Sequence, residues 1–314
     1  MIATFTLNAA IDRTLRVEHL EEGVANRGTL TAARAGGKGI NVASVAHSMG
    51  QEVIVSGFVG GYAGRFIEDY IVSAGMDHDF VPIQAESRNC IAILDSGTGT
   101  ITEVNEAGPE VDFDALSAME RKVEDLAGRC GVCVFSGSLP RGCPHDYYAR
   151  LIKRARKQGA FVVLDTSGPA LRAGIQAEPD LIKPNEHEIK DLLGFEPGSE
   201  PQLIEALQGI RKEWAVDYII VTLGSEGAIC ATPAGFLRVR VPKLPVVNTV
   251  GCGDAFVAGM CVGYERSMPP GEFIRLGAAA ASAKLGSKDA GTCDPQEVRR
   301  LVDEVCVESI VQAV

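Results

Sequence analysis

A glycine-containing turn at residues 251–254 holds the first side chain that could do chemistry, Asp254. The turn comes directly before an apolar run of small residues that is typical of a buried helix. Backbone N–H groups at a helix start have no intrahelical partners, and glycine lets an anion approach them closely. A carboxylate beside an anion site would repel the anion, so Asp254 suggests a general base. An aspartate that caps the helix is the alternative, and this turn taken alone favours the cap.

A second glycine-rich turn, Gly36-Gly37-Lys38-Gly39, precedes an amphipathic pattern that predicts a helix ending at Gly50. A glycine turn with a lysine at a helix start is suited to binding an anion or a hydroxyl group. The spacing is not that of the phosphate-binding loop GxxxxGK[ST]. An exposed lysine in an ordinary turn is the alternative, and the three glycines around Lys38 favour binding.

Further polar residues follow predicted strands, where ligands bind in open α/β sheets. Asp12 lies just past the first strand, and a turn aspartate would explain it equally well. Asn185 and Glu188 are three residues apart and share one face if they are helical, although a capping box has the same spacing. The glycine-containing turn at 222–227 follows another predicted strand. These turns gather at one edge of a doubly wound sheet and require a common explanation.

The elements that must position these turns alternate along most of the chain. A β-rich segment at 236–247 precedes the turn at 251–254, and three helices complete the chain, at 255–264, 272–285 and 296–305. Alternation over this length predicts an α/β fold with a doubly wound, mostly parallel sheet and helices on both faces. The alternating strands are predicted at 53–57, 132–136, 161–165, 181–183 and 218–222, and the helices between them at 65–74, 113–126, 146–158 and 201–214.

Two β-rich patches interrupt this alternation. Residues 13–35 mix β-branched and charged side chains, and residues 88–106 contain a hairpin signal around the turn at 96–99. We expect these strands to leave the main sheet together and form a small β lid over one edge. Residues 1–314 are therefore predicted to be a single α/β domain that carries a lid.

The composition excludes several classes of protein. A formal net charge of −11 argues against a broad nucleic-acid-binding face. No apolar run is long enough to span a membrane, and the first residues lack the basic region of a signal peptide, so we expect a cytoplasmic protein. Nine dispersed cysteines suit a reducing compartment. Cys130 and Cys133 form a C-x-x-C pair within a strand-like segment, where structural core cysteines are favoured over a zinc or redox site.

The motifs in this order resemble the ribokinase-like (PfkB) carbohydrate kinases over essentially the whole chain. The resemblance rests on the turn around Lys38 with Asn41, on Asn185-Glu-His-Glu188, and on Gly251-Cys-Gly-Asp254. Segments 136–140 and 164–168 are similar to the phosphosugar-kinase branch, which contains 1-phosphofructokinase and tagatose-6-phosphate kinase. Enzymes of this branch phosphorylate a ketohexose that already carries one phosphate. The resemblance implies fructose 1-phosphate or tagatose 6-phosphate as acceptor, with ATP and Mg²⁺ as cofactors.

The resemblance also implies roles for individual residues in transfer and nucleotide binding. Asp254 would take the proton of the acceptor hydroxyl, above an anion hole formed by N–H groups of the turn. Mg²⁺ would be held largely through water by Asn185 and Glu188, because this ion dehydrates reluctantly. The implied anion-hole residues are Gly251, Cys252 and Gly253, and the implied nucleotide-binding residues are Lys183, Asn185, Thr222, Gly224 and Gly227.

On the sugar side, Arg88 is the implied ligand of the existing phosphate, because a guanidinium fork matches phosphate oxygens. Arg27 is a second candidate that could act across a dimer. In the family such lids often join two copies, so a homodimer formed through the β lid is expected. The other implied sugar-binding residues are Asp12, Gly37, Lys38, Asn41 and Ser138.

Alternative functions remain open from the sequence. A kinase of an unphosphorylated sugar or nucleoside is the first alternative, and a non-catalytic sugar-phosphate-binding protein is the second. A nicotinamide dehydrogenase would need a G-x-G-x-x-G motif after the first strand, which is missing. The segment around Ala92 lacks a lysine common in the branch, and Cys252 replaces a common alanine. Since thiols at helix starts can have a lowered pKa, we expect Cys252 to react with oxidants or alkylating reagents.

Overall fold

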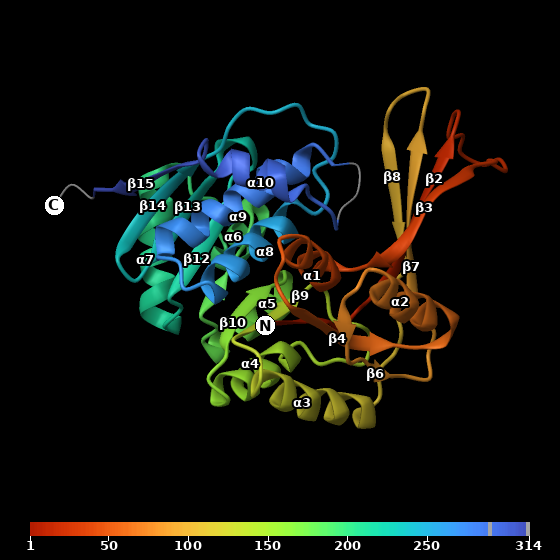
Figure 1. The fold of residues 1–314 in the computed structure, drawn as a ribbon, viewed down its shortest axis with the longest axis horizontal. Helices are drawn as coiled ribbons and strands as arrows, with labels where there is room; N and C mark the ends of the chain where they lie inside the picture. Colours follow the sequence, from red (N-terminus) through yellow and green to blue (C-terminus); the bar gives the residue numbers. More distant parts are fainter. Residues whose placement is uncertain (288–290, 312–314) are drawn as a thin grey trace.

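The computed structural model describes residues 1–287 and 291–311. Its main sheet has 11 strands and runs in the order β15-β14-β13-β12-β11-β10-β9-β1-β4-β5, with β6 also paired to β4 (Figure 1). Pairing is parallel from β5 through β12 and antiparallel from β12 to β15. The strands are β1 (Ile2–Thr6), β4 (Val53–Val59), β5 (Asp77–His78), β6 (Val81–Pro82), β9 (Val132–Ser136), β10 (Phe161–Asp165), β11 (Leu181–Ile182), β12 (Tyr218–Thr222), β13 (Ala228–Thr232), β14 (Gly235–Arg240) and β15 (Cys306–Ile310).

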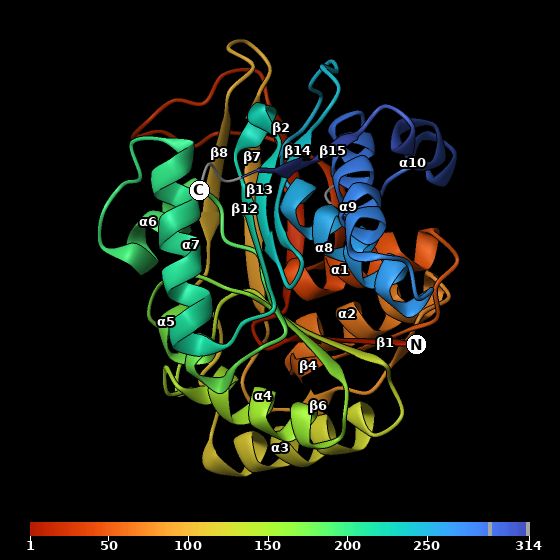
Figure 2. The same cartoon turned by 90° about the vertical axis from the view of Figure 1, so that its left-hand side faces the viewer.

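Helices cover both faces of this sheet, as the alternating sequence predicts (Figure 2). Successive residues of a strand point to opposite faces, so Ile2 joins one apolar cluster and Ala3 the other. One cluster packs against α1 (Lys38–Ser48), α2 (Gly61–Ser73), α8 (Cys252–Glu265), α9 (Pro270–Leu285) and α10 (Pro295–Val302). The other packs against α3 (Phe113–Ala127), α4 (Tyr147–Lys157), α5 (Gly168–Gly174), α6 (Glu186–Leu193) and α7 (Glu200–Trp214).

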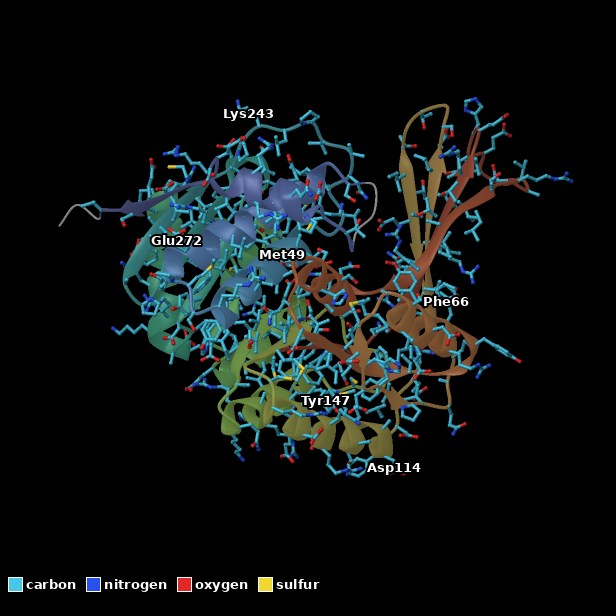
Figure 3. The ribbon with its side chains drawn as sticks, in the orientation of Figure 1. Met49, Phe66, Asp114, Tyr147, Lys243 and Glu272 are labelled. Carbon is cyan, nitrogen blue, oxygen red and sulfur yellow. The ribbon has the colours of Figure 1, made fainter. Side chains whose placement is uncertain are left out.

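A second sheet of four strands, here called the lid sheet, stands out from the body of the molecule (Figure 1). Its order is β3-β2-β7-β8, with β2 and β7 parallel and the other pairs antiparallel. Helix α2 lies under it, and Phe66 of that helix is at its foot (Figure 3). The strands are β2 (Ala10–Val17), β3 (Thr29–Gly36), β7 (Arg88–Asp95) and β8 (Ile101–Asn105).

The C-terminal part differs from the sequence-based prediction in two places. The strand expected to reach residue 247 ends at Arg240, because Pro242 and Pro245 cannot donate to a strand ladder. The last predicted helix ends at Val302 and is followed by the edge strand β15, which we did not predict. Its short, mostly exposed sequence has no alternating pattern that would reveal a strand. In the described ranges 1–287 and 291–311, no helix is long and apolar enough to cross a membrane.

Candidate active site

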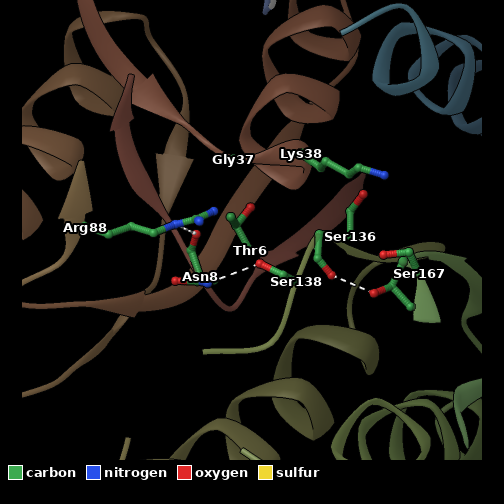
Figure 4. Close-up of a pocket in the computed structure, with 10 residues that line it drawn as sticks. Thr6, Asn8, Gly37, Lys38, Arg88, Ser136, Ser138 and Ser167 are labelled. Carbon is green, nitrogen blue, oxygen red and sulfur yellow. Dashed lines mark hydrogen bonds between the residues drawn. The ribbon is translucent and has the colours of Figure 1, made fainter. Parts of the chain in front are cut away.

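A cavity of about 240 Å³ opens where the carboxyl ends of β1, β9 and β10 meet the start of α1 and the foot of the lid sheet (Figure 4). Arg88 and Lys38 lie at opposite sides of this cavity (Figure 4). Small hydroxyl side chains fill most of the wall between them. The lining residues are Thr6, Asn8, Gly37, Lys38, Arg88, Ser136, Gly137, Ser138, Thr166 and Ser167.

The start of α1 comes close to the end of β1 only because glycine stands at two positions. A Cβ atom at Gly37 would lie 2.5 Å from Cγ2 of Thr6, and one at Gly39 would lie 2.5 Å from Oγ1 of the same threonine. Gly37 also has a φ of 114°, which disfavours other residues. The glycines that the sequence pattern singled out therefore bring Lys38 and the first N–H groups of α1 to the cavity.

Arg88 is held in place by backbone oxygens. Its Nε donates to the carbonyl of Asn8 at 3.1 Å and its Nη1 to the carbonyl of Glu106 at 3.1 Å. Asn8 in turn donates through Nδ2 to Oγ of Ser138 at 3.1 Å. The guanidinium therefore offers positive charge to the cavity from a fixed position, and Asn8 connects it to Ser138.

Asp254 lies inside α8 and not at its cap. The N-cap residue is Gly251 with φ of 85°, and within the described chain no side chain caps this helix. The Asp254 carboxylate is buried and accepts a hydrogen bond from Nδ2 of Asn41 at 2.8 Å. Burial raises the pKa of Asp254 to about 6, helped by the nearby Asp165 charge and opposed by Lys38. The carboxylate is therefore ionised at neutral pH and more basic than an ordinary aspartate, as a general base requires.

Asp165, at the end of β10, is a site residue that we did not predict. Its Oδ1 lies 3.3 Å from Nζ of Lys38 and 3.5 Å from Nζ of Lys183. Its Oδ2 is buried and has no hydrogen-bond partner among the described residues. Burial alone would raise the pKa of Asp165, but the two ammonium groups outweigh burial and lower it. The same carboxylate raises the pKa of Lys38. The Asp165 carboxylate thus contacts both Lys38, which was predicted to bind the sugar, and Lys183, which was predicted to bind the nucleotide.

The turn before α8 is bordered by positive charge. A Cβ atom at Gly253 would lie 3.1 Å from Nζ of Lys183. The Lys183 side chain is almost fully buried, so its ammonium is fixed beside the first N–H groups of α8. Helix N-termini already attract anions through their free N–H groups. The arrangement can bind the anionic group of a phosphate within reach of Asp254.

Asn185 and Glu188 form the capping box that was the alternative interpretation of their spacing. Oδ1 of Asn185 accepts from the backbone N–H of Glu188, and Oε2 of Glu188 accepts from that of Asn185, each at 2.9 Å. Oε1 of Glu188 is not used in the cap and lies 3.9 Å from Nζ of Lys38. The cap therefore fixes one carboxylate oxygen toward the cavity side of α6.

The turn after β12 lies beside this helix start. Thr222 pairs with Asn185 in an isolated bridge. Gly224 and Gly227 have φ values of 54° and 86°, and a Cβ atom at Gly227 would come within 2.0 Å of the Val239 carbonyl. The turn therefore requires glycine at position 227, whereas no neighbour within 4 Å excludes a side chain at position 224.

Asp12 and Arg27 are placed very differently. The Asp12 carboxyl group lies against Gly36. A Cβ atom at Gly36 would lie only 2.1 Å from Cγ of Asp12. Burial raises the pKa of Asp12 to about 6, opposed by Arg88 and Arg34. Arg27 is exposed in the loop between β2 and β3 and does not line the cavity. A substrate contact from Arg27 stays a prediction that depends on a second copy of the chain.

The lowered thiol pKa on which the prediction for Cys252 rests is not supported by the structure. Burial raises the pKa of the Cys252 thiol, and the nearby Asp254 charge raises it further, while Lys284 opposes both. The helix start was expected to lower this pKa, but desolvation is the larger effect here. A raised thiol pKa removes the reason to expect a reactive cysteine at this turn.

The model of the pfkB family of carbohydrate kinases matches residues 5–297. The chain belongs to the pfkB family. This confirms the resemblance drawn from the sequence motifs. A tagatose-6-phosphate kinase of Staphylococcus epidermidis is 36% identical over 277 residues, which cover 88% of this chain and 89% of that protein.

Solved structures also resemble this pfkB kinase. A possible 1-phosphofructokinase of Thermotoga maritima has a TM-score of 0.89 at 26% identity, covering 99% of this chain and 100% of that one. Phosphofructokinase-2 of Escherichia coli, solved with potassium, has a TM-score of 0.91 at 24% identity, covering 96% of this chain and 98% of that one. These neighbours confirm the predicted ribokinase-like α/β fold.

Membership of this kinase family implies ATP as phosphoryl donor, typically with Mg²⁺. Among the described residues, no three or more His, Cys, Asp or Glu side chains are grouped as a metal site. The oxygen atoms at hand are Oε1 of Glu188, which the capping box does not use, and Oδ2 of Asp165, which has no hydrogen-bond partner among the described residues. Such a sparse set fits Mg²⁺, which retains several waters and takes further ligands from nucleotide phosphates.

Proposed function

We propose that this pfkB kinase transfers the γ-phosphoryl group of ATP to a hydroxyl of a ketohexose that already carries a phosphate. The observation that carries the proposal is the cavity with the fixed guanidinium of Arg88 at one side and Lys38 at the other. An arginine fork suits a phosphate already on the sugar. The 36% identity to a tagatose-6-phosphate kinase supports tagatose 6-phosphate as acceptor, and the likeness to a possible 1-phosphofructokinase supports fructose 1-phosphate.

In this proposal Asp254 removes the proton from the acceptor hydroxyl as the phosphoryl group moves. Asn41 holds the carboxylate in position through its hydrogen bond to Oδ2. Phosphoryl transfer needs little covalent chemistry from the protein, so positioning and charge stabilisation supply most of the catalysis. The N–H groups of Gly251 and Gly253 stabilise the charge of the transferred group, while the N–H of Cys252 donates to the Thr249 carbonyl at 3.3 Å.

The nucleotide phosphates bind on the opposite side of Asp254 from the sugar. Lys183 contributes positive charge beside Gly253. Oε1 of Glu188 would hold Mg²⁺ largely through water, and the Asn185 side chain would act by fixing Glu188 through the capping box. When bound, the ion neutralises charge on the β- and γ-phosphates. The nucleotide itself lies along the turn that contains Thr222, Gly224 and Gly227.

The lid sheet supports a homodimer in this proposal. Its outer strands carry exposed apolar side chains: Ile101 and Val104 on β8 and Leu30 on β3 are each about half exposed. A second copy of the lid sheet would cover them and could bring Arg27 toward the partner's cavity. Sedimentation velocity of the intact protein tests the homodimer, since a monomer at micromolar concentration contradicts it.

We place the enzyme in the cytoplasm, where ATP and sugar phosphates are held.

An ADP-release assay across acceptors tests the proposed function. With ATP and Mg²⁺, we expect rapid ADP release with tagatose 6-phosphate or fructose 1-phosphate, and little with fructose, ribose or adenosine. Turnover only with the free sugars or the nucleoside would favour the kinase of an unphosphorylated acceptor. Binding of sugar phosphates without ADP release would favour the non-catalytic binding protein.

Arg88→Ala should raise the KM for the sugar phosphate by about 10- to 100-fold, because a charge-assisted hydrogen bond contributes about 1.5–3 kcal/mol. The KM for ATP should change little, since Arg88 lies on the sugar side. Steady-state kinetics with each substrate varied in turn measures both values. Arg121→Ala, an exposed arginine on α3, is the matched control. An effect confined to the ATP KM would contradict the assignment of Arg88.

A further inference from the structure

A fully buried lysine lies at the end of α9, the helix that packs against α8. Lys284 is in the last turn of α9, and its side chain is 0% exposed. Its Nζ donates to the carbonyl of Ser287 at 3.2 Å. A buried ammonium is costly unless fixed oxygens or charges hold it. The steps described above for transfer do not use Lys284, so its burial requires a separate explanation.

The last turn of α9 is bonded to the segment that leads into the anion hole. The carbonyl of Leu285, next to Lys284, accepts from the N–H of Val247 at 2.9 Å and from that of Asn248 at 3.3 Å. The side chain of Asn248 then accepts from the N–H of Val250 at 2.9 Å. The segment therefore runs from the lysine-bearing end of α9 directly into the turn before α8.

The two helices cannot slide past each other. A Cβ atom at Gly259 of α8 would lie 2.6 Å from the Leu276 carbonyl of α9. A Cβ atom at Gly277 of α9 would lie 2.7 Å from Cγ of Met260. This close packing fixes the end of α9 relative to the start of α8. The Lys284 charge opposes the raised pKa of Cys252, which agrees with an ammonium near the first turn of α8.

We propose that Lys284 is a positioning residue for phosphoryl transfer. Its buried ammonium fixes the end of α9 and thereby holds the turn at 248–253 in the shape that presents its N–H groups. It also adds a constant positive charge behind the anion hole. The inference rests on the proposed function, because that function assigns the turn to the transferred group. A lysine that only stabilises the end of α9 would affect unfolding but not the turn.

Lys284→Met removes the charge and retains most of the side-chain volume. We expect kcat to fall by about 10- to 100-fold, since small displacements of catalytic groups have effects of this size. The KM for the sugar phosphate should stay near its wild-type value, because the cavity is not altered. Lys284→Arg, which keeps the charge, should recover most of the lost kcat. Lys157→Met, an exposed lysine in the last turn of α4, is the matched control.

Chemical rescue separates the charge from packing. In Lys284→Ala, ammonium chloride should restore part of the lost kcat, while sodium chloride at equal ionic strength should not. A structural role alone predicts no difference between the two salts. Wild-type kcat in a folded Lys284→Met variant, or a Lys284→Arg variant as slow as Lys284→Met, would overturn the proposal.

Amide hydrogen exchange gives a readout that does not depend on activity. In Lys284→Met we expect faster exchange at 247–253 and unchanged exchange at 256–262 in the middle of α8. Unchanged exchange at 247–253 would overturn the proposal. If the wild-type enzyme shows no acceptor-dependent ADP release, the proposed function fails, and the exchange data still decide whether Lys284 holds the turn.

Discussion

Asp254→Asn should lower kcat by about a thousandfold, within the range for loss of a general base. The amide has the same shape as the carboxylate, and its oxygen can still accept the hydrogen bond from Asn41. It cannot take a proton from the acceptor hydroxyl. The fold and ATP binding should therefore persist while transfer is lost. The ADP-release assay measures kcat, and calorimetry measures the affinity for ATP.

Asp114→Asn is the matched control, since Asp114 is also in the first turn of its helix but is exposed. Its kcat should equal that of the wild type. Near-normal turnover in Asp254→Asn would exclude Asp254 as the base. The wild-type pH profile gives an independent check. Burial raises the pKa of Asp254 to about 6 in the ligand-free enzyme and only the ionised form can act, so kcat/KM should rise with pH through about 6 and then level off.

Asp165→Asn should lower the free energy of unfolding by about 3–5 kcal/mol at pH 7, as expected when one partner of a buried ion pair is removed. In the wild type, Nζ of Lys183 lies 3.5 Å from Oδ1 of Asp165, and only 4% of the Lys183 side chain is exposed. The amide removes this carboxylate from a lysine that is almost fully buried. Lys38 loses the same partner on the sugar side. Urea unfolding of the two proteins measures the difference, and kcat should fall as well because both lysines lose their fixed positions.

The pH dependence of this difference has a defined sign. The pKa of Asp165 is lowered in the folded state, so its contribution is complete above the unfolded value of about 3.9. The contribution is lost as the pH falls through the folded value. The gap between wild type and Asp165→Asn should therefore be largest near neutrality and shrink in acid. Asp146→Asn, which breaks an exposed pair with Arg150, is the control and should cost about 0–1 kcal/mol. A similarly small loss for Asp165→Asn would show that the two buried lysine contacts do not stabilise the fold.

Much of the fold could be predicted because strong local patterns decide it. The boundaries of β9, β10 and β12 agree with the apolar runs at 132–136, 161–165 and 218–222. The edge strand β15 was missed because an exposed strand has no buried face to impose a pattern on its sequence.

The turns of the site could be predicted from their glycines, but the contacts between turns could not. Asp165 and Lys38 are 127 residues apart, and no local pattern reveals that their side chains meet. The same holds for Asn41 and Asp254, at a separation of 213 residues. The lowered pKa expected for Cys252 is not found because the helix start is visible in the sequence, whereas the burial that raises the pKa is not.

Identification of the reaction product tests the transfer of phosphate to an already phosphorylated ketohexose most directly. The enzyme would be incubated with Mg²⁺, tagatose 6-phosphate or fructose 1-phosphate, and ATP carrying ¹⁸O in its γ-phosphate, with mass spectrometry of the products. We predict a hexose bisphosphate in which the new phosphate alone carries the label, formed together with ADP. Label found only in inorganic phosphate, or only on a free sugar or nucleoside supplied in parallel, would contradict the proposed function.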